Sequence, residues 1–129
     1  MKARTILLIE DNHQNRYLAT FLLERRGFKV VSAEDGRAGI ALADELKPDL
    51  ILLDIQLPML DGYEVARSLR ATNIHCRSII IAVTSFAMAG DRERCLSAGC
   101  DGYLEKPINP ETFVDELERY FPPGIAPAL

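Results

Sequence analysis

The feature of this sequence that most limits its possible folds is a series of short apolar runs without polar alternation. Strands that are covered on both faces have this pattern, whereas strands with one wet face alternate apolar and polar residues. Four runs are rich in Ile, Leu and Val and a weaker fifth follows them: Thr5–Ile9, Phe28–Ala33, Leu50–Ile55, Ser78–Thr84 and Gly102–Leu104. The runs therefore predict the strands of a parallel sheet that is buried on both sides.

Segments with helical spacing of apolar residues separate these runs. They predict helices over Asn15–Arg26, Asp35–Leu46, Tyr63–Ala71 and Gly90–Ala98, and a last helix that has Pro110 in its first turn and ends before Pro122. Alternating strands and helices with right-handed crossovers give a (βα)5 pattern with helices on both faces of the sheet. At this length we expect an α/β domain with the flavodoxin-like doubly wound fold and strand order 2-1-3-4-5.

The composition fits one globular domain and restricts its partners. Hydrophobic residues make up 48% and charged residues 26%, enough for a core and a charged surface. The net charge is −4 and the basic residues are scattered, which argues against a nucleic-acid partner because phosphate backbones require clustered Lys and Arg. We expect residues 1–121 to form the domain and residues 122–129, rich in Pro and Ala, to be a tail or a truncated linker.

The sequence gives no sign of a signal peptide or a membrane span. The apolar stretch that begins at Ile6 stops at Glu10, whereas a membrane-spanning helix needs about 20 apolar residues. The cysteines Cys76, Cys95 and Cys100 are odd in number and lack Cys-x-x-Cys spacing, which favours free thiols in a reducing compartment. We therefore expect a cytoplasmic protein without a membrane partner.

Polar residues appear at the carboxyl ends of four predicted strands. They are Glu10 and Asp11 after the first strand, Asp54 at the end of the third, Thr84 and Ser85 at the end of the fourth, and Lys106 after the fifth. A parallel sheet brings these ends to one edge, and ligands bind where the strand order reverses, here between the first and third strands. Crowded carboxylates require protons or a cation, and an all-oxygen cluster favours Mg²⁺.

Lys106 and the hydroxyl group of Thr84 add a positive charge and a hydrogen-bond donor beside Asp54. This combination suits a phosphoryl group on Asp54, because the phosphoryl oxygens need positive charge and donors during transfer. Carboxylates are nucleophiles toward phosphoryl groups and form aspartyl phosphates. The sequence thus predicts that Asp54 accepts a phosphoryl group in the presence of Mg²⁺.

Over residues 4–121 the chain resembles the response-regulator receiver family of two-component and phosphorelay signalling. The matching residues are Glu10-Asp11, Asp54 followed by Leu57-Pro58 and Asp61-Gly62, Thr84, Tyr103 and Lys106-Pro107. The run Phe86-Ala87-Met88 with Gly90-Asp91 is similar to receivers of hybrid sensor kinases and to single-domain cell-cycle regulators. The resemblance implies that Asp54 is the phosphorylation site and that Lys106 and Thr84 contact the phosphoryl oxygens.

The resemblance also implies a metal site and a switch. Glu10, Asp11, Asp54 and the backbone carbonyl of Ile55 would bind Mg²⁺. Glu10 stands where many receivers have a second Asp, and its longer side chain would contact the ion through a water molecule. Tyr103 would turn inward as the Thr84 side chain moves toward the phosphate. A cis peptide bond is expected between Lys106 and Pro107, which X-Pro bonds permit.

The partners that the resemblance implies are proteins. A histidine kinase or a histidine phosphotransfer protein would donate the phosphoryl group. The surface of the fourth helix, fifth strand and fifth helix would then bind a downstream protein. No DNA-binding segment follows residue 121, so we expect no output domain in this chain and no turnover of an external substrate.

Other interpretations of the same residues stay open at this point. Glu10-Asp11 would also serve as caps of the first helix, and Tyr103 as a core aromatic. A haloacid-dehalogenase-type phosphatase would place a second Asp two residues after Asp54, where Gln56 cannot act as a general acid. A flavodoxin would need a Gly-rich or Ser/Thr-rich phosphate loop where the acidic pair stands. A receiver that signals without phosphate would not require the complete residue set.

Overall fold

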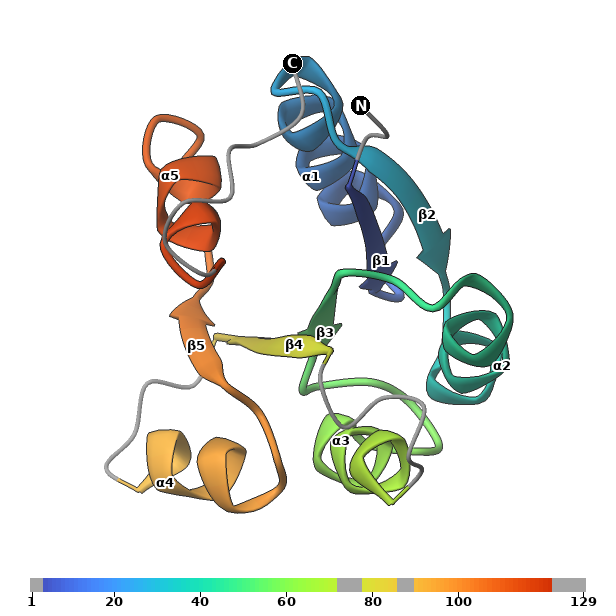
Figure 1. The fold of residues 1–129 in the computed structure, drawn as a ribbon. Helices are drawn as coiled ribbons and strands as arrows, with labels where there is room; N and C mark the ends of the chain where they lie inside the picture. Colours follow the sequence, from blue (N-terminus) through green and yellow to red (C-terminus); the bar gives the residue numbers. More distant parts are fainter. Residues whose placement is uncertain (1–3, 72–77, 86–89, 122–129) are drawn as a thin grey trace.

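The computed structural model describes residues 4–71, 78–85 and 90–121, and these alternate between strands and helices (Figure 1). In chain order the elements are β1 (Thr5–Ile9), α1 (His13–Arg25), β2 (Lys29–Ala33), α2 (Gly36–Leu46), β3 (Leu50–Asp54), α3 (Gly62–Arg70), β4 (Ile79–Thr84), α4 (Asp91–Ser97), β5 (Gly102–Glu105) and α5 (Phe113–Glu118). All strand pairs in this described part are parallel, in the order β2-β1-β3-β4-β5. The predicted α/β doubly wound sheet is therefore confirmed.

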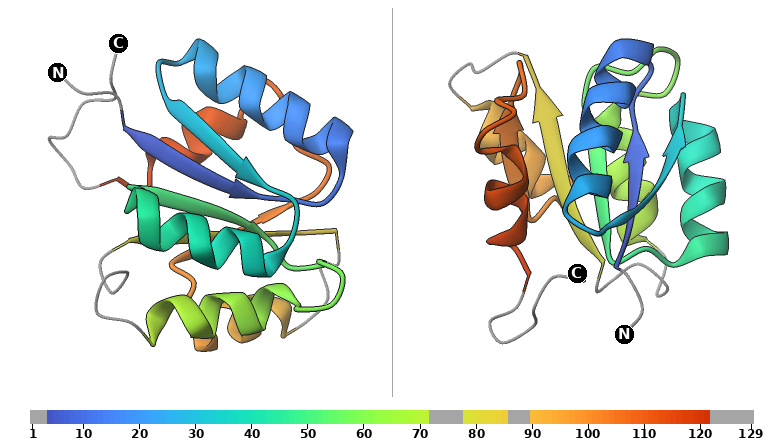
Figure 2. Two further views of the ribbon diagram at one scale, coloured as in Figure 1. Left: turned by 90° about the vertical axis from the view of Figure 1, so that its right-hand side faces the viewer. Right: turned by 90° about the horizontal axis from the view of Figure 1, so that it is seen from above.

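Helices cover both faces of the sheet, α1 and α5 on one face and α2, α3 and α4 on the other (Figure 2). Successive residues of a strand point to opposite faces. In β1, Ile6 and Leu8 pack with α1 and α5, while Leu7 and Ile9 pack with the other three helices. The central strands β1, β3 and β4 lack polar alternation because both of their faces are buried, whereas the edge strand β2 exposes Lys29 and Ser32.

The starts of the first three helices follow from side-chain caps. Asn12 accepts a hydrogen bond from the backbone N–H of Asn15 at 2.9 Å, so α1 begins at His13, two residues before the predicted start. Asp35 and Asp61 cap α2 and α3 in the same way. The interpretation of Glu10-Asp11 as caps of the first helix is wrong, because Asn12 fills that position.

The last helix is shorter than the sequence predicts. It begins at Phe113, and Pro110 lies in a turn before it, in which the N–H groups of Thr112 and Phe113 donate to the carbonyl of Asn109. The Asn109 side chain also accepts the N–H of Glu111 at 3.0 Å. Such local side-chain bonds offer the backbone an alternative to the helix and delay its start.

Arg70, the last residue of α3, connects three segments at the edge of the sheet opposite the polar strand ends. Its guanidinium group donates to the carbonyls of Gly99 and Ser78, both at 2.7 Å, and to the Asp101 carboxylate at 2.6 Å. The same Asp101 oxygen accepts the backbone N–H of Ile80 at 2.8 Å. Arg70 therefore joins α3, the start of β4 and the turn before β5.

We expect Arg70→Ala to lower the free energy of unfolding by about 3 kcal/mol, because two carbonyls and one carboxylate lose a shared charged donor. Arg67→Ala, on an exposed position of the same helix, is the matched control and should change that energy by less than about 0.5 kcal/mol. Urea denaturation followed by circular dichroism measures both values. Equal destabilisation by the two substitutions would contradict this role of Arg70.

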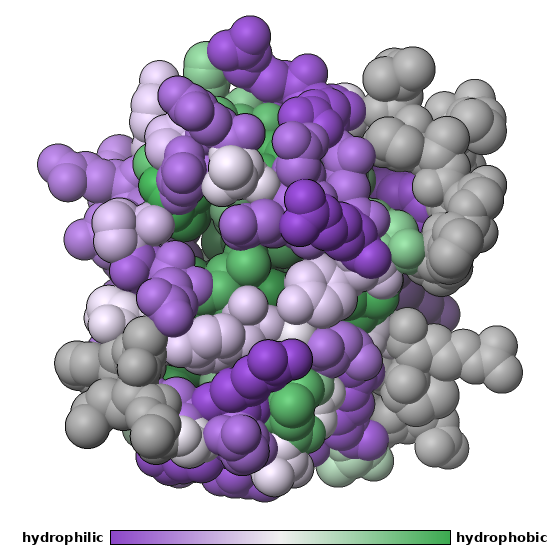
Figure 3. Space-filling view, turned by 90° about the vertical axis from the view of Figure 1, so that its left-hand side faces the viewer, coloured by the Kyte–Doolittle hydropathy of each residue, from purple (hydrophilic) through white to green (hydrophobic). Residues whose placement is uncertain are grey.

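One face of the molecule is formed by α4, β5 and α5, and it contains a hollow in which apolar residues are surrounded by polar ones (Figure 3). A cavity of about 450 Å³ lies here, lined by Arg92, Leu96, Asp101, Gly102, Tyr103, Glu105 and Tyr120. The Leu96 and Tyr120 side chains are 44% and 36% exposed. Gly102 has no side chain, and the Tyr120 ring packs directly over its Cα. This face thus exposes large apolar groups next to Tyr103.

Some predictions concern the cysteines and residues that the structure does not describe. Cys95 and Cys100 are free and buried, while Cys76 lies outside the described residues. The same holds for residues 86–89 and for the predicted tail, residues 122–129. Among the helices that are described, none has the length and apolar character required to cross a membrane.

Candidate functional site

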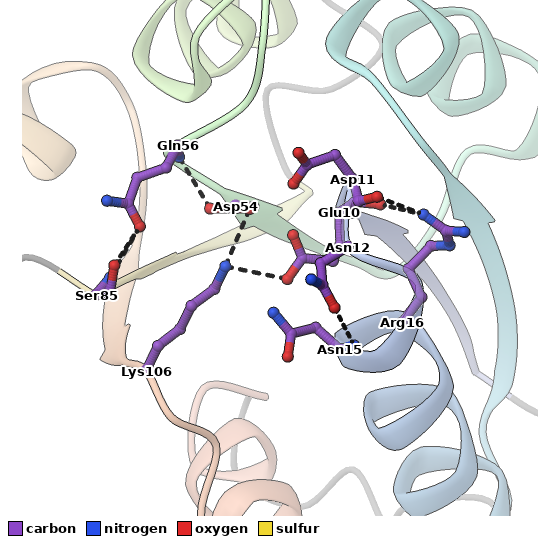
Figure 4. A network of polar contacts seen from close by, with 9 residues as sticks. All are labelled: Glu10, Asp11, Asn12, Asn15, Arg16, Asp54, Gln56, Ser85 and Lys106. Atoms are coloured by element: carbon purple, nitrogen blue, oxygen red, sulfur yellow. Dashed lines mark hydrogen bonds and ion pairs between the residues drawn. The ribbon is translucent and has the colours of Figure 1, made fainter.

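The acidic residues predicted from the strand ends meet at one edge of the sheet (Figure 4). The parallel register pairs Ile9 with Leu53, so the next residues along the two strands, Glu10 and Asp54, lie side by side. The side chains of these two residues are buried, with 4% and 3% of their surface exposed, whereas Asp11 is exposed. One carboxylate oxygen from each of the three lies within 4.8 Å of the others.

Lys106 brings a positive charge to the two buried carboxylates. Its Nζ lies 3.0 Å from Glu10 Oε1 and 3.0 Å from Asp54 Oδ2. Its backbone N–H donates to the carbonyl of Thr84 at 2.8 Å, which fixes the end of β5 against the end of β4. The peptide bond between Lys106 and Pro107 is cis, as the sequence predicts. Lys106 therefore points into the site.

The pKa values of the two buried carboxyl groups are shifted in opposite directions. Burial disfavours the charged form of Asp54, but contacts with Glu10, the Gln56 N–H at 2.9 Å and Lys106 outweigh burial and lower the pKa of Asp54. Burial and the adjacent Asp54 charge raise the pKa of Glu10 from 4.5 to about 7. Glu10 Oε2 is buried and has no hydrogen-bond partner among the described residues. The site thus has an uncompensated oxygen and favours an added cation or proton.

The raised pKa of Glu10 predicts a pH-dependent stability of the Mg²⁺-free protein. Between pH 4.5 and about 7 the native state binds more protons at Glu10 than the unfolded state does. The free energy of unfolding therefore falls as the pH rises through this window. We expect Glu10→Gln to remove this loss and to stabilise the protein above pH 7 by about 2 kcal/mol.

Urea denaturation in EDTA at several pH values measures this difference. The stabilisation should shrink toward zero near pH 4.5, where Glu10 is protonated in the native state. Glu45→Gln, on an exposed position of α2, is the control and should follow the wild type at every pH. Wild-type stability of Glu10→Gln above pH 7 would contradict the prediction, because it would show that the buried Glu10 charge does not destabilise the native state.

Two other predicted residues lie on neighbouring strands. Thr84 is the last residue of β4 and is buried, one position beyond Val83, which pairs with Asp54. Tyr103 is half-buried on β5, where it pairs with Ala82 and packs against the core beneath α2, α3 and α4. Thr84 therefore lies at the edge that carries the acids, whereas Tyr103 lies two residues before the end of β5, beside the hollow described above.

The loop after β3 holds the Ile55 carbonyl, the predicted backbone ligand of the metal. This carbonyl accepts a hydrogen bond from the N–H of Gly62 at 3.0 Å. A carbonyl oxygen has two lone pairs, so one is available for a metal.

Arg16 is a residue of this site that the sequence did not single out. From the first turns of α1, its guanidinium group donates to the carbonyls of Glu10 at 3.0 Å and Asp11 at 3.1 Å, and it pairs with Glu34 at 3.3 Å. It thus fixes the backbone of both acids. An arginine on an amphipathic helix gives no signal in sequence that would distinguish it from a surface charge.

Comparisons with known proteins agree on the family. The family model described as the response regulator receiver domain matches residues 6–118. The polar-differentiation response regulator DivK of Brucella anthropi is 38% identical over 117 residues, which cover 91% of this chain and 95% of that protein. The solved structure of chemotaxis protein CheY4 of Vibrio cholerae has a TM-score of 0.89 at 27% identity and covers 93% of this chain and 100% of that one.

A second solved structure bears on the acidic site. The receiver domain of the sensor histidine kinase PA1611 from Pseudomonas aeruginosa PAO1 is 39% identical, with a TM-score of 0.84 over 92% of this chain and 98% of that chain. That structure has a magnesium ion coordinated in its active-site cleft. The fold, the matching family model and these relatives show that the chain belongs to the response regulator receiver domain family of two-component signalling.

Proposed function

We propose that this receiver domain accepts a phosphoryl group on Asp54 from a phosphohistidine donor and that the modification changes a protein-binding surface. Phosphorylation of an aspartate and binding of Mg²⁺ are general in the family, and receiver domains interact with histidine kinases or phosphotransfer proteins. The observation that carries the proposal is the Lys106 ammonium group, held 3.0 Å from each of two buried carboxylates. A carboxylate with lowered pKa beside an ammonium group is a prepared nucleophile.

The oxygen donors of the site fit Mg²⁺. This ion prefers carboxylate and carbonyl oxygens and retains several waters, and Glu10 Oε2 is a buried oxygen with no partner among the described residues. In the proposal, Asp11, Asp54 and the backbone carbonyl of Ile55 would hold the ion, and Glu10 would contact it through water. When bound, the ion supplies positive charge to the phosphoryl oxygens.

The transfer requires no base on this chain. The lowered pKa of Asp54 keeps it as a carboxylate near neutral pH. A carboxylate oxygen attacks the phosphorus atom, the bond between phosphorus and the donor imidazole breaks, and the imidazole nitrogen keeps the electron pair. Lys106 and the Thr84 hydroxyl group then donate to the phosphoryl oxygens.

The output surface in this proposal is the face of α4, β5 and α5. Thr84 ends β4 next to β5, and Tyr103 lies on β5 beside the hollow that contains Leu96 and Tyr120. A shift of Thr84 toward the phosphoryl group opens space that the Tyr103 ring can enter. The exposed apolar groups of this face would then bind a downstream protein, as exposed apolar patches do.

Acetyl phosphate with Mg²⁺ tests the phosphoacceptor part of the proposal. Intact-mass spectrometry should show one added phosphoryl group, and EDTA should prevent its addition. Incorporation at the same rate in EDTA would contradict the metal assignment. The chain has no tryptophan, so metal binding is followed by NMR.

Beryllofluoride with Mg²⁺ tests the switch. This phosphoryl mimic should shift the NMR signals of Thr84, Tyr103 and the α4–β5–α5 face together, because the proposal couples them. The outer residues of α2, far from that face, provide the internal control. Shifts confined to the residues around Asp54 would contradict the switch and leave the phosphoacceptor assignment intact.

A further inference from the structure

A contact between the side chain of Gln56 and Ser85 joins two loops beside Asp54 (Figure 4). Gln56 follows β3 and Ser85 follows β4, so the contact crosses between neighbouring strand ends. Gln56 Oε1 accepts hydrogen bonds from Ser85 Oγ at 2.6 Å and from the Ser85 backbone N–H at 3.1 Å. Gln56 also donates its own backbone N–H to Asp54 Oδ1 at 2.9 Å.

The orientation of the Gln56 carboxamide follows from chemistry. The backbone N–H of Ser85 is a donor, so the Gln56 atom that faces it must be the oxygen and not the NH₂ group. A carbonyl oxygen has two lone pairs, and Ser85 engages both. The Gln56 side chain thus retains only its NH₂ group, a donor, for any other interaction.

We infer that this contact prolongs the lifetime of the phosphoryl group on Asp54, an inference that rests on the proposed function. Loss of the group requires a water oxygen to attack phosphorus while the bond from phosphorus to the Asp54 oxygen breaks. The Asp54 carboxylate keeps the electron pair, and the water proton passes to the released phosphate or to solvent. A glutamine carboxamide oxygen accelerates phosphoryl hydrolysis when it orients this water.

In this chain the carboxamide oxygen that could orient water is held by Ser85. Gln56 lies close enough to Asp54 for a backbone hydrogen bond, so its side chain would reach the phosphoryl group if it were released. Ser85 is exposed, and of its two hydrogen bonds to Gln56 the one from the hydroxyl group is the shorter. Ser85 is therefore a positioning residue that acts through Gln56 and withholds a group that would promote hydrolysis.

Dephosphorylation rates of four variants test this inference. The protein is phosphorylated with acetyl phosphate and Mg²⁺, the donor is removed by desalting, and the remaining phosphoprotein is followed over time. Ser85→Ala should accelerate the loss about fivefold or more, because it removes the hydroxyl bond at 2.6 Å and leaves one lone pair of the Gln56 oxygen free to orient water, while the backbone bond remains. Ser85→Thr retains the hydroxyl group and should dephosphorylate at close to the wild-type rate.

The same Ser85 substitution in a variant without the Gln56 carboxamide distinguishes a role through Gln56 from a general structural role of Ser85. In Gln56→Met, which lacks the carboxamide oxygen, a further Ser85→Ala substitution should bring no acceleration. Acceleration of equal size in that background would overturn the inference, and so would an unchanged lifetime in Ser85→Ala that phosphorylates normally. Absence of phosphorylation in the wild type would instead overturn the proposed function on which the inference rests.

Discussion

Asp54→Asn is expected to reduce phosphoryl incorporation from acetyl phosphate by about 100-fold or more, because the amide replaces the nucleophilic carboxylate. Asp54 is the acid of this cluster whose pKa is lowered and that is bound by both Lys106 and the Gln56 N–H. Glu10 is protonated below about pH 7 in the absence of metal and is the weaker nucleophile. Intact-mass spectrometry in the presence of Mg²⁺ measures the added phosphoryl group.

Asp61→Asn is the matched control for this experiment. Asp61 caps α3 through a hydrogen bond to the Glu64 N–H at 2.9 Å, and asparagine is as good a cap as aspartate. The control should therefore incorporate phosphate like the wild type, and circular dichroism should show both variants folded. Incorporation that persists in Asp54→Asn would assign the phosphoacceptor to Glu10 or Asp11.

Gly62→Ala is expected to lower the free energy of unfolding by about 3 kcal/mol, because the added methyl group overpacks a backbone contact. A Cβ atom at Gly62 would contact the Cα of Ile55 and lie 2.7 Å from the carbonyl oxygen of Asp54. Both are backbone atoms, so no change of rotamer relieves the overlap. The Gly62 N–H also donates to the Ile55 carbonyl at 3.0 Å, and this bond would be distorted.

The same substitution should weaken Mg²⁺ binding about tenfold, because the loop that follows Asp54 must move away from α3. Ser68→Ala, on the exposed side of α3, is the control and should change neither quantity. Urea denaturation measures stability, and NMR titration measures Mg²⁺ affinity. Wild-type values for both in Gly62→Ala would show that the loop adapts without displacing the site.

The elements of the fold could be predicted because their signals are local. The buried runs of Ile, Leu and Val predicted the strands, and their lack of alternation predicted a sheet covered on both faces. The boundaries were less predictable. Asn12 caps α1 before the predicted start, and the turn at Asn109 delays α5, since side-chain bonds to the backbone compete with the hydrophobic pattern there.

The site was predicted through the geometry of parallel strands. Glu10, Asp54 and Lys106 stand at strand ends in the sequence, and a parallel sheet must bring such ends to one edge. The structure confirms that these side chains meet, while their roles in phosphoryl transfer stay a proposal. Arg16 could not be predicted, because its contacts with two backbone carbonyls depend on where α1 lies against β1.

The sequence by itself determined the element types and the edge at which the acids gather, because hydrophobic periodicity and strand-end polarity are properties of the chain. The sheet order followed from the doubly wound architecture that is typical of a (βα)5 chain of this length. Only the tertiary structure decided which atoms touch. Three features depend on the separation of distinct elements to within a few tenths of an ångström: the Glu10 oxygen with no partner among the described residues, the two hydrogen bonds from Ser85 to Gln56 Oε1, and the close approach at Gly62. Packing fixes those distances, and no local pattern encodes them.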